Sequence, residues 1–414
     1  MNSIDIRSIE KKGETITYHY EVEGDWRQYF QQDQPFFVSY EGEDVTQVPD
    51  SIAVIPLMVN LLPMAWVTDA TIRVPELDLD FYNNIIKIRG GYCAMYPQME
   101  LGGKVEAAKL VNHADAPSER TAAFFSGGAD AFSTLITHTA EHPSLITLFG
   151  SDIRLDDREG EQRVREHALA TGREFGCPNL FIHSSFRLFL REGALTELVL
   201  PQSGDNYWHG FQHGIGLIGH AAPYAYLHRL KTVYIASSFT AKDRGKVTCA
   251  SDPTIDNHVH MASCTTVHDG YEFTRQQKIA RIVAYQQRTG RRIALHVCWQ
   301  SRGGGNCCAC EKCYRTICEI FAENGEPREM GFAYDDGLFS RMKRDFRWRI
   351  VFDDVMRAYW KDIKARLLDH PQVLEKYPGL RWMTQTDFSH ADQPVALRKK
   401  IYRWLQRVER RLSR

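Results

Sequence analysis

The stretch TAAFFSGGADAF, residues 121–132, indicates the fold of the chain. Its first five residues are typical of a buried strand, and the residues from Thr134 onward are typical of a helix. Between them, Gly127 and Gly128 permit a tight turn and a close approach of the backbone to a ligand. Because N–H groups at the start of a helix attract anions, the stretch predicts a phosphate-binding loop. The alternative is a strand-to-helix turn that Asp130 caps.

The segments that follow alternate between strand-like and helix-like patterns. This alternation predicts an α/β fold, with a parallel sheet that has helices on its faces. Ligands of such sheets bind beyond the carboxyl ends of the strands, where the glycine loop lies. We expect strands within 144–150, 179–185 and 232–238, and helices within 159–176 and 211–230.

The first part of the chain has a different pattern, in which short polar and apolar stretches alternate as in antiparallel strands. We therefore expect a β-rich accessory domain at residues 1–118, a catalytic domain at 119–330 and a helical C-terminal region at 331–414. The last segment, 396–414, is basic and has apolar residues at helical spacing. It is typical of a closing amphipathic helix with a solvated basic face, rather than of a membrane or RNA surface.

The charges of the chain are balanced, with 51 Lys and Arg against 52 Asp and Glu. This balance gives no overall attraction to nucleic acid, so we expect a protein partner before a nucleic acid. The most apolar segment, residues 51–67, is short and contains two prolines, so we expect no membrane span. The N-terminus lacks an apolar signal core, and we expect a cytoplasmic protein.

Six of the ten cysteines lie within residues 298–318. Four of them have the spacing Cys-x8-Cys-x2-Cys-x2-Cys, which supplies enough thiolates to close a tetrahedral zinc shell. Cys308 and Cys318 are additional thiols, either of which could replace a ligand. The alternative is a cluster of free or redox-active thiols, and the four cysteines outside this segment fit ordinary buried thiols. The predicted ligands are Cys298, Cys307, Cys310 and Cys313.

The segment Ser126-Gly127-Gly128-Ala129-Asp130 resembles the SGGxD(S) loop of the N-type ATP pyrophosphatases, the PP-loop family. The resemblance implies the HUP fold of adenine-nucleotide α-hydrolase-like domains, in which the loop binds the ATP phosphates and Asp130 holds Mg²⁺. The chain departs from the family pattern at Ala131, where the family usually has Ser. The implied ATP-binding residues are Phe125, Ser126, Gly127, Gly128, Ala129, Asp130, Ser133 and Thr134.

The loop and the cysteines together resemble the 7-cyano-7-deazaguanine synthases of queuosine biosynthesis, over about residues 119–320. The resemblance includes Arg315 and Lys278, and it implies catalytic roles for Asp130 and Lys278 with ATP, Mg²⁺ and Zn²⁺ as cofactors. It implies an ATP-dependent carbon–nitrogen ligase that activates a carboxylate, such as a 7-deazaguanine carboxylate, releases pyrophosphate and forms an amide or nitrile. Relatives with extra regions occur in antiviral defence, where the acceptor can be a protein.

Two other functions stay open. Some PP-loop enzymes transfer sulfur to an adenylated nucleobase, and Cys308 or Cys318 could carry that sulfur. A zinc-stabilised binding module without catalysis is the other alternative, with Ala131 as the inactivating change. The extra residues 1–118 or the basic tail would dock a macromolecular partner.

A group of histidines accompanies these motifs. His209 and His213 lie four residues apart, so on one helix they would share a face and could hold a metal or contact phosphate. The alternative is ordinary helix histidines. The segment from Asp205 to His213 lies where PP-loop enzymes shape the substrate pocket, and the same pocket could be lined by Asp256, His258 and His260.

Overall fold

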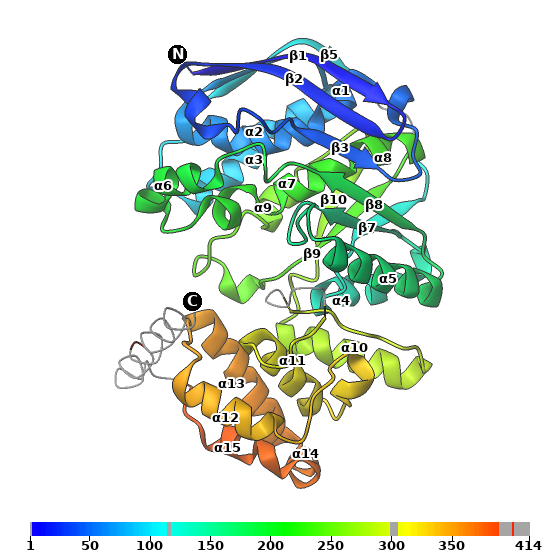
Figure 1. Cartoon of the computed structure of the whole chain (residues 1–414), viewed down its shortest axis with the longest axis vertical. Coiled ribbons are helices and arrows are strands. Elements are labelled where there is room, and N and C mark those ends of the chain that lie inside the picture. Colours follow the sequence, from blue (N-terminus) through cyan, green and yellow to red (C-terminus); the bar gives the residue numbers. More distant parts are fainter. Residues whose placement is uncertain (1, 114–116, 299–304, 389–399, 401–414) are drawn as a thin grey trace. The chain divides into compact units, whose positions relative to one another are not determined.

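The computed structural model of the chain describes residues 2–113, 117–298, 305–388 and 400. The chain divides into two compact units (Figure 1). The first unit comprises Met1–Ser126 and Asp130–Glu272, and the second comprises Gly127–Ala129 and Phe273–Arg414. Among the described residues, no helix is long and apolar enough to cross a membrane.

The first unit contains one sheet of ten strands in the order β10-β9-β6-β7-β8-β3-β2-β1-β4-β5. Neighbouring strands are parallel except in the pairs β1–β2, β2–β3 and β3–β8. The predicted α/β class with a parallel sheet is confirmed at this level. The strands are β1 (Ser3–Lys12), β2 (Thr15–Glu23), β3 (Phe37–Tyr40), β4 (Thr71–Asp78), β5 (Lys104–Val111), β6 (Thr121–Phe124), β7 (Ser144–Phe149), β8 (Asn179–Ser184), β9 (Thr232–Ala236) and β10 (Thr265–Asp269).

The strand order reverses at β6. The chain passes from β6 to β7 and β8 on one side, and then returns to place β9 and β10 on the other side of β6. β7 has the sequence SLITLF and is buried at all but one position, as expected for a parallel strand covered on both faces. The carboxyl ends of β6 and β9 therefore flank a topological switch point, where open α/β sheets bind ligands.

The helices of the described residues up to position 272 follow or connect these strands. They are α1 (Asp50–Ala53), α2 (Ile55–Thr68), α3 (Leu79–Met95), α4 (Ala129–Thr137), α5 (Arg158–Phe175), α6 (Glu192–Ser203), α7 (Ile215–Ile218), α8 (Ala222–His228) and α9 (Pro253–Asp256). The short 3₁₀ helices in this part are η1 (Gly24–Tyr29), η2 (Val45–Gln47), η3 (Thr139–Glu141), η5 (Gly219–Ala221) and η6 (Ala241–Asp243), and a π-helical turn, η4, spans Trp208–Gln212.

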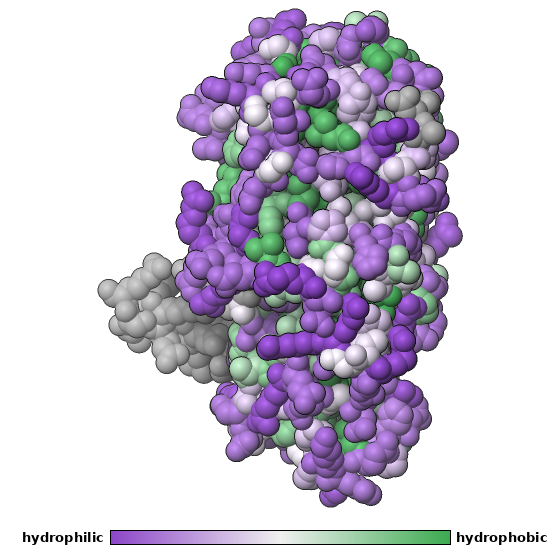
Figure 2. All heavy atoms as spheres, turned by 90° about the vertical axis from the view of Figure 1, so that its right-hand side faces the viewer, coloured by the Kyte–Doolittle hydropathy of each residue, from purple (hydrophilic) through white to green (hydrophobic). Residues whose placement is uncertain are grey.

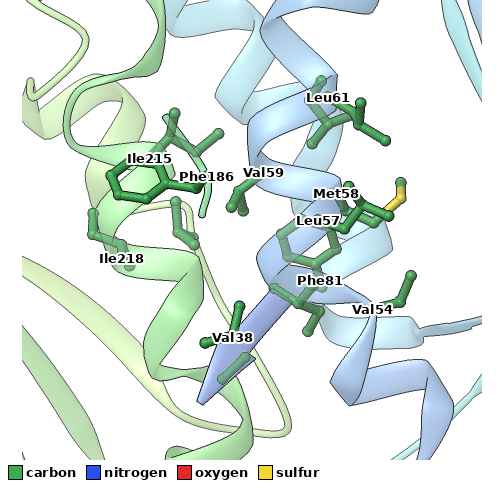
Figure 3. Packing of buried hydrophobic residues seen from close by; sticks show 14 of the residues in the cluster. Val38, Val54, Leu57, Met58, Val59, Leu61, Phe81, Phe186, Ile215 and Ile218 are labelled. Carbon is green, nitrogen blue, oxygen red and sulfur yellow. The ribbon is translucent and has the colours of Figure 1, made fainter. Parts of the chain in front are cut away.

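The apolar helix α2 forms the centre of the hydrophobic core. Its residues from Ile55 to Trp66 are all buried, which explains why its sequence lacks a polar face. Figure 3 shows Val59 of α2 facing Ile215 and Ile218 of α7. The approach is close because Gly219 follows α7: a Cβ on Gly219 would lie 2.4 Å from Cγ2 of Val59.

Residues 1–118 differ from the expected β-rich accessory domain. They contribute five strands and three helices to the first unit, and β3 pairs directly with β8, with Val38 opposite Ser184 and Tyr40 opposite Ile182. The Tyr40 hydroxyl also donates to the backbone oxygen of His220 (2.9 Å). The alternating sequence pattern predicted strands in this part of the chain. It could not predict that one of them, β3, pairs with the strand β8 of the parallel sheet.

The predicted helix at 211–230 is broken in the structure. His213 has ψ 151° and Gly214 has φ 76°, so the chain leaves the helical conformation between η4 and α7. A Cβ on Gly214 would lie 2.6 Å from the Ser251 Cα and 2.8 Å from the Ala250 oxygen. Glycine is therefore required here both by conformation and by the close approach of the 250–251 backbone.

The second unit is helical, and its main segment begins at Phe273, before the predicted boundary at residue 331. Its aromatic core includes Phe346 against Trp360, with ring centroids 4.5 Å apart. The predicted basic helix lies outside the described residues, except for Lys400. The helices are α10 (Arg275–Thr289), α11 (Glu311–Ala322), α12 (Leu338–Trp348), α13 (Asp354–Asp369), α14 (Pro371–Lys376) and α15 (Arg381–Gln385), with 3₁₀ helices η7 (Pro327–Met330) and η8 (Pro378–Leu380).

The face of the molecule in Figure 2 is mainly hydrophilic, and its hydrophobic side chains occur in small groups. Exposed apolar residues such as Ile86 and Leu368 are of a kind common on protein surfaces. They indicate no particular docking site.

The close packing at Gly219 gives a test of the core. Gly219→Ala should lower the free energy of unfolding by about 1–3 kcal/mol, because the added methyl group collides with Val59 while the helical φ of −60° itself accepts alanine. Gly193→Ala is the matched control, since nothing lies within 4 Å of its Cβ position and it should be neutral or stabilising by up to about 1 kcal/mol. Urea denaturation measures both, and equal stability of the two variants would contradict the described packing.

Candidate functional site

The four predicted ligand cysteines come together in the second unit. Their sulfur atoms all lie within 4.8 Å of one another. The Sγ atoms of Cys298 and Cys310 are 3.9 Å apart, as are those of Cys307 and Cys313. A tetrahedral zinc ion with four bonds of about 2.3 Å needs sulfur atoms about 3.8 Å apart. The thiols therefore fit a closed zinc shell.

The local fold explains how this cluster forms. Cys310 is the N-cap residue of α11, and its Sγ accepts a hydrogen bond from the Cys313 N–H (3.4 Å). The start of α11 carries a partial positive charge that favours thiolates. Hydrogen bonds from the side chain and backbone of Cys313 lower the pKa of Cys310 to about 5, whereas the bond to Cys310 raises the pKa of Cys313. Four thiolates this close require a cation, and the cluster is compatible with a bound metal ion such as zinc.

Cys308 and Cys318 lie outside the cluster. Cys308 has a left-handed backbone, with φ 50°, and its Sγ lies 3.7 Å from the Asn306 oxygen. Cys318 is buried on α11, 3.5 Å from the sulfur of Met342. Spacing alone allowed Cys308 or Cys318 to replace a ligand. The cysteines that come together are the four predicted ones.

Asn306 is a supporting residue that the sequence did not reveal. Its amide donates to the Leu295 oxygen (2.7 Å) and the Gly331 oxygen (2.9 Å), and its Oδ1 accepts from the Val297 N–H (3.0 Å). These bonds fix the backbone on both sides of the cluster, just before Cys298 and just before Cys307. A single Asn in a glycine-rich loop carries no pattern that indicates this role.

The same segment reaches the glycine loop. The His296 N–H donates to the Gly127 oxygen (2.7 Å), two residues before the ligand Cys298. Gly127 has φ 75°, a left-handed conformation that suits glycine. The cysteine cluster thus holds the backbone that contacts the loop.

The predicted strand, loop and helix are present at residues 121–137. Phe125 is buried and packs edge-on against Phe132, with ring centroids 5.1 Å apart, so its side chain belongs to the core. Ser126 is exposed, and Asp130 lies half-buried in the first turn of α4. Among the predicted loop residues with polar side chains, Ser126 and Asp130 are therefore the two that are not buried.

The two hydroxyl residues of α4 are buried. Ser133 is 2% exposed, and the Thr134 hydroxyl donates to Oδ2 of Asp269 (2.7 Å). Asp269 ends β10, so this bond ties α4 to the sheet. Lys278 lies on the buried side of α10 in the second unit.

The histidines separate into distinct groups. His209 Nδ1 lies 2.8 Å from Oδ2 of Asp205, and His213 Nδ1 lies 3.6 Å from the sulfur of Cys249. Asp256 instead pairs with His268, also at 2.8 Å. His260 pairs with a different acid, because its Nδ1 lies 3.6 Å from Oδ1 of Asp80. Cys249, which the sequence placed among ordinary buried thiols, is thus a neighbour of the predicted histidine pair.

No family model, curated protein or solved structure matches the chain.

The cysteine cluster predicts one zinc ion per chain. Cys313→Ser should lower the zinc content of the purified protein to a small fraction of one equivalent, because it removes a buried cysteine from a shell for which the described residues supply four ligand atoms. Cys308→Ser is the control and should keep one equivalent, since its sulfur lies outside the cluster. Elemental analysis by plasma mass spectrometry gives the measurement. Full zinc in Cys313→Ser, or zinc lost from Cys308→Ser, would contradict the ligand set.

Proposed function

We propose that the protein is an ATP-dependent ligase that activates a carboxylate as an acyl adenylate and then forms a carbon–nitrogen bond. One observation carries this proposal: the glycine loop follows β6, at the switch point of a mostly parallel sheet. This is the place where open α/β sheets bind nucleotides. The loop leads directly into α4, whose N-terminus favours a phosphate.

The residues of the loop have distinct roles in this proposal. The N–H groups of residues 127–129 bind phosphate oxygens, and the exposed Ser126 hydroxyl donates to them. Asp130, in the first turn of α4, holds Mg²⁺ beside the phosphates. In the step in which the carboxylate oxygen attacks the α-phosphorus, negative charge builds on the departing pyrophosphate. The backbone N–H groups and Mg²⁺ stabilise this charge and so accelerate the step.

The chemistry needs two steps. The bond between the α-phosphorus and the bridging oxygen breaks as the carboxylate oxygen bonds to phosphorus, which gives the acyl adenylate and pyrophosphate. An amine nitrogen then attacks the carboxyl carbon, and AMP leaves with the electron pair of the broken carbon–oxygen bond. The sequence resemblance favours a 7-deazaguanine carboxylate as the substrate and a role in antiviral defence.

Sulfur transfer has less support. A sulfur carrier must form a thiolate, yet burial raises the pKa of Cys308 to about 11 and raises the pKa of Cys318 well above its ordinary value. Cys318 is also fully buried. Neither additional thiol near the zinc cluster fits the carrier role.

The test is the position at which ATP is split. With Mg²⁺, ATP and 7-carboxy-7-deazaguanine, the wild-type protein should form AMP and pyrophosphate, and Asp130→Ala should reduce this at least about 100-fold because the metal loses its ligand. Asp354→Ala is the matched control: Asp354 also lies in the first turn of a helix, but its side chain is fully exposed. Mass spectrometry identifies the products. Formation of ADP, or equal turnover by Asp130→Ala and the wild type, would refute the proposal.

A further inference from the structure

The surroundings of Cys249 are unlike those of an ordinary buried thiol. Its Sγ lies 3.6 Å from Nδ1 of His213, and His209 is a second imidazole whose proximity lowers the pKa of the thiol. Asp205 holds His209 at Nδ1, and the Thr248 hydroxyl donates to the same carboxylate oxygen (3.0 Å). A thiol, two imidazoles and an orienting carboxylate are the parts of an activated cysteine nucleophile.

The backbone is shaped to bring these groups together. η4 is a π-helical turn, in which the His213 N–H donates to the Trp208 oxygen (2.7 Å). Such turns are rare and are found frequently at functional sites. The His209 oxygen accepts from the Ala250 N–H (2.8 Å), which fixes the segment that carries Cys249 against the turn.

A helix from the first part of the chain supports this turn. The Tyr92 hydroxyl of α3 donates to the Phe211 oxygen (2.6 Å), and the Tyr96 hydroxyl donates to the Gly210 oxygen (3.1 Å). The Tyr96 ring also stacks on Phe211, with centroids 4.8 Å apart. Residues 1–118 thus contribute directly to the position of His209 and His213.

The cluster also borders the carboxyl edge of the sheet. Asp152, which follows β7, helps to raise the pKa of His213, and Phe239, which follows β9, has its ring centroid 6.2 Å from that of His209. β7 and β9 are the two neighbours of β6. The Cys249 cluster therefore lies beside the loops that flank the proposed adenylate site.

A second observation points to a ligand here. Asp256 is fully buried, and its Oδ1 has no hydrogen-bond partner among the described residues, although Oδ2 bonds to His268 and Ser251. This Oδ1 lies 2.8 Å from the Cβ position of Gly214, next to His213. A buried carboxylate oxygen without a donor is costly, and an amine or ammonium ligand would supply the donor.

The arrangement is not that of a metal site. Within the described ranges, the four cysteines of the second unit are the only group of three or more potential ligand atoms that lie within 4.8 Å of one another. The Cys249 sulfur instead pairs with the imidazole of His213. Such an arrangement suits proton transfer to and from sulfur.

We propose that Cys249 is a nucleophile that takes the acyl group from an activated carboxylate as a thioester and passes it to an amine. This inference rests on the proposed function for the identity of its acyl donor. The Cys249 sulfur bonds to the carboxyl carbon while the carbon–oxygen bond to AMP breaks, and AMP takes the electron pair. The amine nitrogen then bonds to the same carbon, and the carbon–sulfur bond breaks to regenerate the thiolate.

His213 releases and accepts the protons of the two steps. In the resting protein the thiol proton lies on an imidazole, and after acylation His213 has lost its thiolate partner and releases a proton to water. Neutral His213 then accepts the proton of the attacking amine. His209 is a positioning residue, because Asp205 keeps it protonated beside the sulfur.

The charges around the thiol are consistent with this scheme. Burial opposes ionisation of Cys249, but His209 and His213 outweigh it and lower its pKa to about 6. The hydrogen bond from Asp205, aided by Cys249, raises the pKa of His209 to about 10. Burial opposes protonation of His213, yet Cys249, Asp152 and Asp256 raise its pKa overall.

The tyrosines that face the thiol stay neutral. Burial raises the pKa of Tyr92 and of Tyr96, so neither adds a charge near Cys249 below pH 8. A group with a lowered pKa is ionised above that value, so the thiolate should be present above about pH 6 and should be lost as the pH falls through 6.

The test uses p-nitrophenyl acetate, an activated acyl donor that needs no ATP. The wild-type chain should release a burst of about one equivalent of p-nitrophenolate and gain one acetyl group, which peptide mass spectrometry locates on Cys249. Cys249→Ser should lose the burst. The control Cys93→Ser should keep it, because Cys93 is an exposed thiol on α3. The wild-type measurement decides the matter even if Cys249→Ser fails to fold.

The pH profile separates a nucleophile from a merely structural ion pair. The burst rate should rise to half its maximum near pH 6, and His213→Gln should lower the rate at pH 7 about tenfold and move the midpoint upward. No acetylation of Cys249 between pH 5 and 8, or an unchanged profile in His213→Gln, would overturn the proposal. Acetylation of Cys249 without pyrophosphate release from ATP would instead refute only the proposed function.

Discussion

The antiparallel pairing of β3 with β8 is the contact on which the first unit depends. Three residue pairs, from Val38 opposite Ser184 to Tyr40 opposite Ile182, join the parallel strands around β6 to the strands of the first 118 residues. The Phe37 N–H also donates to the Ser185 hydroxyl (2.9 Å). Without this pairing, β8 would be an open sheet edge, with unpaired backbone groups. One hydrophobic core instead extends from Ile4 to Cys264.

This continuity explains which parts of the fold the sequence could predict. The strand, loop and helix at residues 121–137 and the four cysteines are local patterns, set by neighbours within about fifteen residues. The β3–β8 pairing joins residues about 145 positions apart, and no local pattern encodes such a partner. The break at Gly214 depends in the same way on a distant contact, the backbone of Ser251.

The candidate sites show the same division. Spacing predicted the four cysteines that come together, because donors close in sequence can meet without a distant contact. Asn306 acts through the backbone and leaves no spacing pattern. The Cys249 and His213 side chains come from positions 36 residues apart. Their meeting results from the tertiary packing of the 250–251 backbone against the residue after His213, which a sequence pattern does not carry.

The π-helical turn at Trp208–Gln212 has a further consequence. A turn of this kind accommodates one more residue than an α-helical turn, and each residue of an α-helix advances the side chains by about 100°. Loss of a single residue from the turn would let it close as an α-helix and would swing His213 out of line with Cys249 by about that angle. A related chain that lacks one residue in this turn would thus keep the same core and sheet. It would have no histidine beside the thiol.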